Sequence, residues 1–203
     1  KVIKKYPSGD QEVTALQETS INIENGRLLL VIGPSGSGKT TLLLMLGGII
    51  TPSSGNVIFR NEKLNQIQEN ERTKLRLHHM GFVFQNINLI KPLKVIENVM
   101  FPARLVHKSS SKAYDLALRA IKKTGLSEKI NAYPEELSGG EQQRIAVARA
   151  IVTEPSLLLC DEPTASLDGD SLKTVMKELR NIADSGKAVV VVSHDKRLET
   201  YAD

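Results

Sequence analysis

The 203-residue sequence contains a single cysteine, Cys160, and no long uninterrupted apolar run. One cysteine excludes a disulfide bond within the chain and fits a reducing compartment. The longest apolar stretch, 42–50, contains two glycines and is much shorter than the ~20 residues that a membrane-spanning helix needs. The net charge of +4 is too small to argue for nucleic-acid binding by itself. The remaining composition, 40% hydrophobic and 25% charged with no internal repeat, is that of an ordinary globular protein.

The strongest pattern in the sequence is G-x-x-x-x-G-K-[ST] at residues 33–40. It follows an apolar run of buried-strand type, Leu28–Ile32, and precedes a predicted helix at 40–46. A strand, a glycine loop and a helix are the context of a phosphate-binding loop, because the loop N–H groups and the helix start attract anions. We therefore predict that a nucleoside triphosphate binds here, at Gly33, Pro34, Ser35, Gly36, Ser37, Gly38, Lys39, Thr40 and Thr41.

The first part of the chain favours β-structure. Residues 1–25 alternate as strands do, including 21–23, with a turn at 7–10. A second turn, at 52–55, leads into a predicted strand at 56–59. These segments predict a small β lobe next to the phosphate loop.

The middle of the chain favours helices. Residues 61–78 suit a loop and a short helix, and helical character runs over 86–153. One helix, at 112–124, should stop at Gly125. Before this region, residues 81–85 look like another buried strand. The nearly continuous apolar runs at 157–160 and 188–192 suit parallel strands buried on both faces.

Four apolar runs end directly before polar residues. The first ends in the phosphate loop, and the others end before Gln85, before Asp161 and Glu162, and before Ser193 and His194. Ligands of open α/β sheets bind beyond the carboxyl ends of the strands. If the four strands are parallel neighbours, all of these groups should converge on the nucleotide.

Asp161 and Glu162 have the position of the second acidic motif of phosphate-loop ATPases. Asp161 is expected to hold Mg²⁺, largely through water, and the Thr40 hydroxyl to ligate the same ion. Lys39 would reach the β- and γ-phosphates. Glu162 is placed to polarise the attacking water as general base.

Residues 137–144 read LSGGEQQR and precede a predicted helix. Ser138 and Glu141 form a capping-box pattern, which explains a helix start. The pattern does not explain Gly139 and Gly140, since glycine weakens a helix. Two glycines at a helix N-terminus suit close approach to a phosphate. Because the phosphate loop already supplies one anion site, we expect the second to serve a nucleotide held by another subunit.

Together these motifs resemble the ATP-binding cassette (ABC) proteins over nearly the whole chain. The 137–144 segment is similar to the family signature, and the other matches are the phosphate loop, the glutamine loop at Gln85, the Asp161–Glu162 pair, the D-loop Ser166-Leu167-Asp168, the switch histidine His194 and the adenine-stacking position Tyr6. The lead-in at Tyr6 and the 81–85 stretch look most like the lipoprotein-release, cell-division and macrolide-efflux branch. Family members usually continue further after the histidine, and this chain starts with Lys, so we expect residues to be missing at its ends.

The resemblance implies roles within one copy of the chain. Gln85 would contact Mg²⁺ and the attacking water and sense a membrane subunit. His194 would contact the γ-phosphate and hold Glu162 and the water in line, which completes a catalytic set with Lys39. Tyr6 would stack on adenine, although a tyrosine at a strand edge is an equally simple description of it.

The resemblance also implies roles across two copies. Ser138, Gly139 and Gly140 would bind the γ-phosphate held by a second copy, and Asp168 would bridge the two sites. ATP and Mg²⁺ would then lie inside a head-to-tail homodimer whose ATP hydrolysis drives a separate transmembrane permease. This implies a peripheral protein on the cytoplasmic face of the cell membrane, with no nucleic-acid partner.

The fold that the resemblance implies is α/β, a P-loop NTPase ABC cassette with a mainly parallel sheet core, a small antiparallel β lobe and an inserted helical subdomain. We expect one ATP-binding domain over 1–203. Its ATPase core and β lobe would comprise 1–85 and 154–203, and its helical subdomain 86–153.

Alternatives stay open at this point. A soluble ABC ATPase acting on nucleic acid or ribosomes is disfavoured by one cassette, no heptad run and a lone cysteine. A regulatory subunit with little turnover would not need both the glutamate and the histidine of the predicted site. The loop at 86–95 carries apolar residues that either dock a permease helix or pack inside the helical lobe, namely Ile87, Leu89, Ile90 and Leu93. The sequence does not identify the cargo, the direction of transport or the permease.

Overall fold

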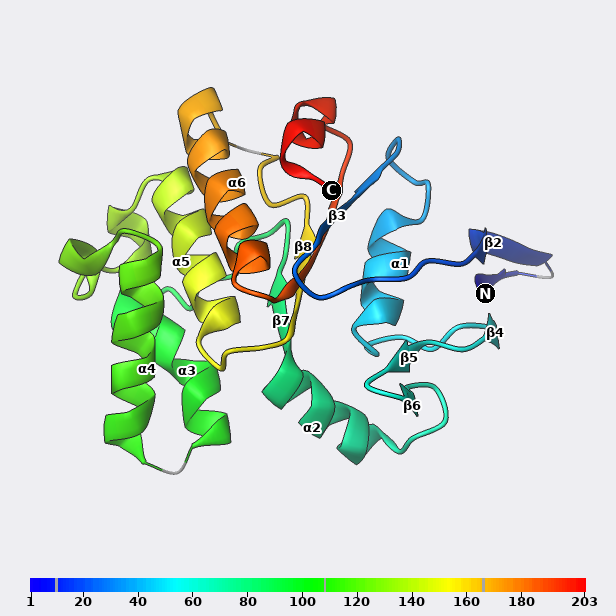
Figure 1. Ribbon diagram of the computed structural model, residues 1–203, viewed down its shortest axis with the longest axis horizontal. Coiled ribbons are helices and arrows are strands. Elements are labelled where there is room, and N and C mark those ends of the chain that lie inside the picture. The colour runs from blue at the N-terminus through cyan, green and yellow to red at the C-terminus, as the bar shows by residue number, and fades with distance from the viewer. Residues whose placement is uncertain (10, 108, 166) are drawn as a thin grey trace.

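The structure is a computed structural model that describes residues 1–9, 11–107, 109–165 and 167–203. Its centre is a sheet of four parallel strands (Figure 1). In spatial order these are β3 (Leu28–Ile32), β9 (Ala188–Ser193), β8 (Leu157–Asp161) and β7 (Met80–Val83). The prediction that the four apolar runs are parallel neighbours is therefore confirmed. The strand β7 ends at Val83, earlier than predicted, so that Phe84 and Gln85 lie outside the sheet.

Alternate residues of the central strand β9 point into two separate hydrophobic cores. Val190 and Val192 pack on the side of helix α1 (Lys39–Leu46) with Leu43, whereas Val189 and Val191 pack on the opposite face. All four valines are fully buried. A strand buried on both faces gives a continuous apolar run in the sequence rather than an alternating one.

Four helices form the other side of the molecule: α3 (Val95–Val106), α4 (Ser110–Lys123), α5 (Gly139–Ile151) and α6 (Gly169–Asp184). The predicted stop after α4 is confirmed, since Gly125 has a φ of +69°. Helix α5 contacts α3 and α4 on one side and β7 and α6 on the other, and one hydrophobic cluster joins these helices to the sheet. The predicted division of the chain at 86 and 153 stays a prediction.

A small antiparallel sheet forms the β lobe, in the order β2 (Gln11–Thr19), β1 (Val2–Ser8), β4 (Ser54–Gly55). The chain turns between β1 and β2 at Gly9, within the predicted turn at 7–10, but Pro7 and Ser8 belong to β1 and Asp10 lies outside the described residues. The alternating residues 21–23 are not in a strand, because β2 ends at Thr19. The prediction of β-structure at 21–23 is therefore wrong.

The predicted strand at 56–59 is also wrong in its extent. Ser54 and Gly55, predicted as a turn, pair with β1, while β5 (Ile58–Phe59) forms a separate hairpin with β6 (Glu62–Lys63). Arg60 and Asn61, between β5 and β6, have φ of +51° and +69°. Two successive positive φ angles make the tight turn of a two-residue hairpin, so this segment folds back instead of extending the sheet.

The remaining elements of the described residues are one helix and three short 3₁₀ turns. Helix α2 (Glu69–His79) leads into β7. The 3₁₀ turns are Ser127–Lys129, Pro134–Glu136 and Lys196–Tyr201. Within the described part of the chain, no helix is long and apolar enough to cross a membrane.

Helices α5 and α6 each carry a buried polar side-chain atom. Gln143 Nε2 and Glu178 Oε2 are both buried with no hydrogen-bond partner among the described residues. Burial raises the pKa of Glu178 to about 8, against the opposing attraction of Arg144 on α5. An ionised carboxylate is costly in such surroundings, so the surroundings of Glu178 favour its neutral form.

Glu178→Gln should therefore stabilise the protein in a pH-dependent way. Between its ordinary pKa of 4.5 and about 8, the folded protein holds a proton on Glu178 that the unfolded chain has lost. Stability falls as the pH rises through this window, because the unfolded state binds fewer protons. Glutamine cannot ionise, so the gain in melting temperature should be larger at about pH 9 than at about pH 4. An equal gain at both values would show that the carboxylate is not desolvated.

Candidate functional site

The phosphate loop lies between β3 and α1, at the carboxyl end of the parallel sheet. Gly36 and Gly38 have φ of +80° and +88°, a left-handed conformation that side chains rarely adopt. A Cβ atom at Gly38 would also lie 2.2 Å from the carbonyl oxygen of Ala15 on β2. The Gly33 N–H donates to the Ser193 carbonyl at 3.3 Å, which ties the loop to β9. The loop therefore depends on glycine at two positions and on its neighbour strands.

Two side chains at the start of α1 reach different partners. Lys39 Nζ donates to the carbonyl oxygens of Gly33 at 2.7 Å and Pro34 at 2.9 Å. Thr40 Oγ1 donates to Asp161 Oδ1, at the end of β8, at 3.1 Å. Burial raises the pKa of Asp161, and the Thr40 hydrogen bond opposes that rise. A buried carboxylate beside a hydroxyl is a position where a cation would favour the charged form.

Glu162 directly follows β8 and has both carboxylate oxygens engaged. Ser193 Oγ donates to Oε2 at 2.9 Å, and His194 Nδ1 lies 2.8 Å from Oε1. The Glu162 side chain is 11% exposed and the His194 side chain is 57% exposed, so the histidine is the member of the pair that faces solvent. Glu162 has a φ of +45°, and its N–H donates to the Val192 carbonyl at 2.9 Å. Backbone strain of this kind costs about 1–3 kcal/mol and clusters at active sites.

The signature segment begins α5. The Ser138 hydroxyl accepts from the Glu141 N–H at 3.3 Å, and Glu141 Oε2 accepts from the Ser138 N–H at 2.8 Å, so the predicted capping box is confirmed. A Cβ at Gly139 would meet nothing within 4 Å, whereas a Cβ at Gly140 would lie 2.6 Å from Ser171 Oγ on α6. Gly139 therefore has open space around it, whereas Gly140 packs against Ser171.

Asp168 caps the start of α6. Its carboxylate accepts from the N–H groups of Asp170 at 3.0 Å and Ser171 at 2.9 Å, and from the Ser171 hydroxyl at 3.0 Å. These hydrogen bonds lower the pKa of Asp168, and the one from the Ser171 N–H contributes most. Of the predicted D-loop, Leu167 and Asp168 are described, and Ser166 lies outside the described residues.

The predicted residues fall into two groups in space. Figure 1 shows the phosphate loop before α1 at the upper right of the sheet and the starts of α5 and α6 at the upper left. Within the described residues, no hydrogen bond joins Ser138 or Asp168 to the phosphate loop or to the glutamate–histidine pair. This separation fits the prediction that α5 serves a nucleotide of another copy.

Tyr6 and Gln85 are also separate from the hydrogen-bonded groups. Tyr6 lies on β1 opposite Val13, is 41% exposed, and has Lys4 Nζ 4.8 Å from its ring centre. An ammonium over a ring face is a favourable cation–π contact, so both descriptions of Tyr6 remain open. Gln85 is exposed in a bend shortly after β7.

A groove of about 540 Å³ lies between α2, β7 and α3, with a mainly apolar lining that includes Leu77, Phe82, Phe84, Ile90 and Phe101. Ile90 is 38% exposed and Phe101 48%. In the 86–95 loop, Leu89 packs against the buried core, as the packing alternative expects, whereas Ile90 lines the groove. Docking of a permease at this loop stays a prediction. Another cavity, of about 460 Å³, opens at the amino ends of β8 and β9 and includes none of the predicted site residues.

Sequence reasoning missed two residues that hold the 86–95 loop. Arg149 on α5 donates to the carbonyl oxygens of Asn88 at 2.7 Å and Ile87 at 2.8 Å. The fully buried Asn98 on α3 accepts from the Ile90 N–H at 2.7 Å and donates to the Ile90 carbonyl at 3.1 Å. A polar residue amid the apolar face of a helix was the only signal in the sequence, since buried asparagine is uncommon.

Known proteins of similar sequence and structure share this architecture. The ABC transporter family model matches residues 16–165. A protein described as the hemin import ATP-binding protein HrtA of Staphylococcus haemolyticus is 39% identical over all of this chain and 91% of its own length. The macrolide export ATP-binding/permease protein MacB of Burkholderia pseudomallei is 35% identical over all of this chain, which spans 31% of MacB.

The solved structures agree with these matches. A dimeric structure of MJ0796, a bacterial ABC transporter cassette, has a TM-score of 0.91 at 37% identity, covering 99% of this chain and 89% of that one. A post-hydrolysis structure of the MJ0796 dimer, bound to ADP and Pi, has a TM-score of 0.90 at the same identity and coverage. The predicted fold class is therefore confirmed, as is the resemblance to the macrolide-efflux branch. With its phosphate loop, acidic pair and signature helix in one cassette fold, the chain belongs to the ABC transporter family as one of its ATPase cassettes.

Proposed function

We propose that two copies of this cassette close head to tail around two ATP molecules and that hydrolysis drives a separate permease from the cytoplasmic face of a membrane. The observation that carries the proposal is the Glu162 carboxylate, which contacts Ser193 and His194 and directly follows Asp161, the hydrogen-bond partner of Thr40. The proposal is supported by MJ0796, solved as a dimer and with ADP and Pi, and by MacB, whose name joins an ATP-binding part to a permease.

The phosphate loop and the start of α1 bind the triphosphate in this proposal. The loop N–H groups and the partial positive charge of the helix N-terminus attract the phosphates. Lys39 exchanges its two carbonyl partners in the loop for phosphate oxygens. Tyr6 stacks on adenine through the ring face that Lys4 does not cover.

The residues at the end of β8 fit a Mg²⁺ ion. Thr40 Oγ1 and Asp161 Oδ1 are oxygen donors that already lie 3.1 Å apart, and Gln85 is a further ligand in this proposal. The described residues contain no cluster of three or more His, Cys, Asp or Glu side chains that suits a metal held by protein alone. Mg²⁺ is usually bound by one or two carboxylates together with water and substrate phosphates. When bound, it would neutralise phosphate charge.

Glu162 acts as the general base. It accepts a proton from the water that attacks the γ-phosphorus, and the bond from that phosphorus to the bridging oxygen breaks to leave ADP and phosphate. Ser193 and His194 orient the carboxylate, since each contacts one of its oxygens. In this proposal, the exposed His194 contacts the γ-phosphate as well.

The second copy completes each site. Its Ser138, Gly139 and Gly140 contact the γ-phosphate, and its Asp168 bridges the two sites. The start of α5 suits this role, because the helix N-terminus attracts anions and Gly139 has open space around it.

The permease docks in the groove of about 540 Å³ between α2, β7 and α3. Exposed apolar side chains in a concave site mark protein interaction surfaces, and Ile90 and Phe101 are such side chains here. Gln85 lies just before the loop that lines this groove. A shift of that loop would therefore reach the nucleotide site through Gln85.

Glu162→Gln should convert the cassette into an ATP-bound dimer with slow turnover. Glutamine keeps the shape of the side chain but does not accept the proton, and a positioned base contributes about 10²–10⁴-fold. Light scattering behind a sizing column should give 22.3 kDa without ATP and twice that mass with Mg-ATP. The exposed Glu128→Gln should keep the parent turnover as the matched control. Turnover at the parent rate in Glu162→Gln would remove this residue from the base role.

Ser138→Arg should separate nucleotide binding from closure. The long cation fills the space at the start of α5 that the partner's γ-phosphate needs, while the chain's own phosphate loop is untouched. Calorimetry should give a monomer affinity for ATP close to that of the parent, whereas ATP-dependent dimers and turnover are lost. The exposed Ser127→Arg is the control for added charge. A collapse of monomer affinity would place Ser138 in the site of its own copy.

Phe101→Cys should crosslink to a membrane protein in cells of the source organism. The native Cys160 is fully buried and burial raises its thiol pKa, so the new thiol is the reactive one. A thiol-reactive crosslinker on Phe101→Cys should give an adduct with a membrane-spanning protein. Tyr114→Cys, with 41% exposure on α4 outside the groove, should give none. Equal adducts from both variants would contradict docking in the groove.

A further inference from the structure

The first turns of α5 and α6 meet at Gly140 and Ser171. A Cβ atom at Gly140 would lie 2.6 Å from Ser171 Oγ and 2.9 Å from Ser171 Cβ. Both separations are shorter than any that packed side chains keep, so even alanine at this position would push the two helices apart. The neighbouring Gly139 has no atom within 4 Å of the corresponding point.

Conformational freedom does not explain the glycine at this position. Gly140 is absent from the residues with positive φ and lies inside the regular helix α5. Glycine weakens a helix relative to alanine. The close approach of α6 is therefore the physical reason that the described structure offers for Gly140 within a single copy.

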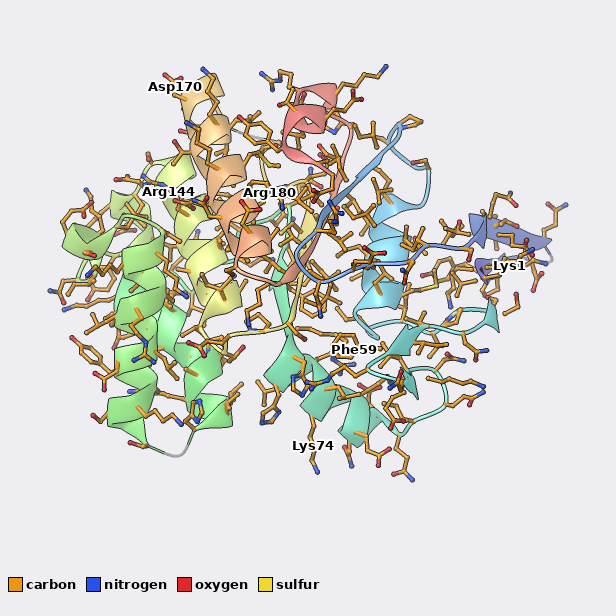
Figure 2. All side chains as sticks on the ribbon, in the orientation of Figure 1. Lys1, Phe59, Lys74, Arg144, Asp170 and Arg180 are labelled. Atoms are coloured by element: carbon orange, nitrogen blue, oxygen red, sulfur yellow. The ribbon has the colours of Figure 1, made fainter. Side chains whose placement is uncertain are left out.

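Ser171 also holds Asp168. Its hydroxyl donates to Asp168 Oδ2 at 3.0 Å, and its N–H donates to Asp168 Oδ1 at 2.9 Å. One side chain thus contacts both the signature end of α5 and the acidic cap of α6. Figure 1 shows both helices starting at the same end of the molecule, and Figure 2 labels Asp170 there, on the first turn of α6.

We infer that Ser171 is a positioning residue that joins the signature and Asp168 into one rigid unit, so that both reach the partner's nucleotide site in a fixed relation. The inference rests on the proposed closure of two copies. In it, Gly140 lets α6 approach in each copy, while Gly139, with open space around it, leaves room at the phosphate of the other. A change at Ser171 then alters closure without touching the nucleotide of its own copy.

A double-mutant cycle on the protein without nucleotide tests the contact. Gly140→Ala should lower the melting temperature by roughly 3–10 °C, the scale of an overpacked contact in a chain of this size. Gly139→Ala, with open space around it, should not lower it. The penalty of Gly140→Ala should shrink with Ser171→Ala, which removes only the hydroxyl, and vanish with Ser171→Gly, which also removes the Cβ. An equal penalty in all three backgrounds would overturn the contact.

A second measurement tests the positioning role, in the Glu162→Gln background where dimers accumulate. Ser171→Ala should leave the monomer affinity for ATP unchanged and weaken ATP-dependent dimerisation by about tenfold, the scale of one lost hydrogen bond. Ser171→Thr, which keeps a hydroxyl, should restore it. Dimerisation equal to that of the Glu162→Gln parent in Ser171→Ala would overturn the inference and leave the two-copy proposal standing. If the parent itself forms no dimer, the two-copy proposal is wrong and the inference falls with it.

Discussion

The parallel pairing of β9 with β3 on one side and β8 on the other is the constraint on which the site depends. The register places Ile32 opposite Ser193 and Asp161 opposite Val192, so the three strands end within one residue of each other. Their next residues continue the contacts, since the Gly33 N–H donates to the Ser193 carbonyl. A shift of one residue would turn every side chain of β9 to the opposite face. Both hydrophobic cores and the site would be lost together.

Much of the fold follows from local patterns in the sequence. The phosphate loop has fixed spacings, the central strands are continuous apolar runs, and the start of α5 has a capping box at Ser138. The extents of weak strands do not follow in the same way. Gly55 pairs with β1 while Ile58 turns back on β6, because partners far along the chain decide where each pairing begins. The order of strands in the sheet was not predicted either, since β9 lies between β3 and β8 although it comes last of the four in the chain.

The residues of the site likewise include some that local patterns predict and some that they do not. Gln85, Asp161, Glu162 and His194 were predicted because each follows an apolar run and matches a family motif. The contacts of Arg149 with the 86–95 loop and of Ser171 with Gly140 were not predicted, since each joins residues that no pattern links. Such contacts depend on helix packing, which a single sequence does not specify.

The close approach of Gly38 to the β lobe has a consequence for nucleotide selection. A Cβ at Gly38 would lie 2.2 Å from the Ala15 carbonyl oxygen and 3.2 Å from the Leu16 side chain, so the backbone of the loop lies directly against the backbone of β2. In the proposed complex, Tyr6 of the β lobe stacks on the base and the loop binds the phosphates. The distance between the base site and the phosphate site is then fixed by two backbone segments that are in contact. Rearrangement of side chains would therefore not accommodate a nucleotide with a longer or shorter distance between its base and its phosphates.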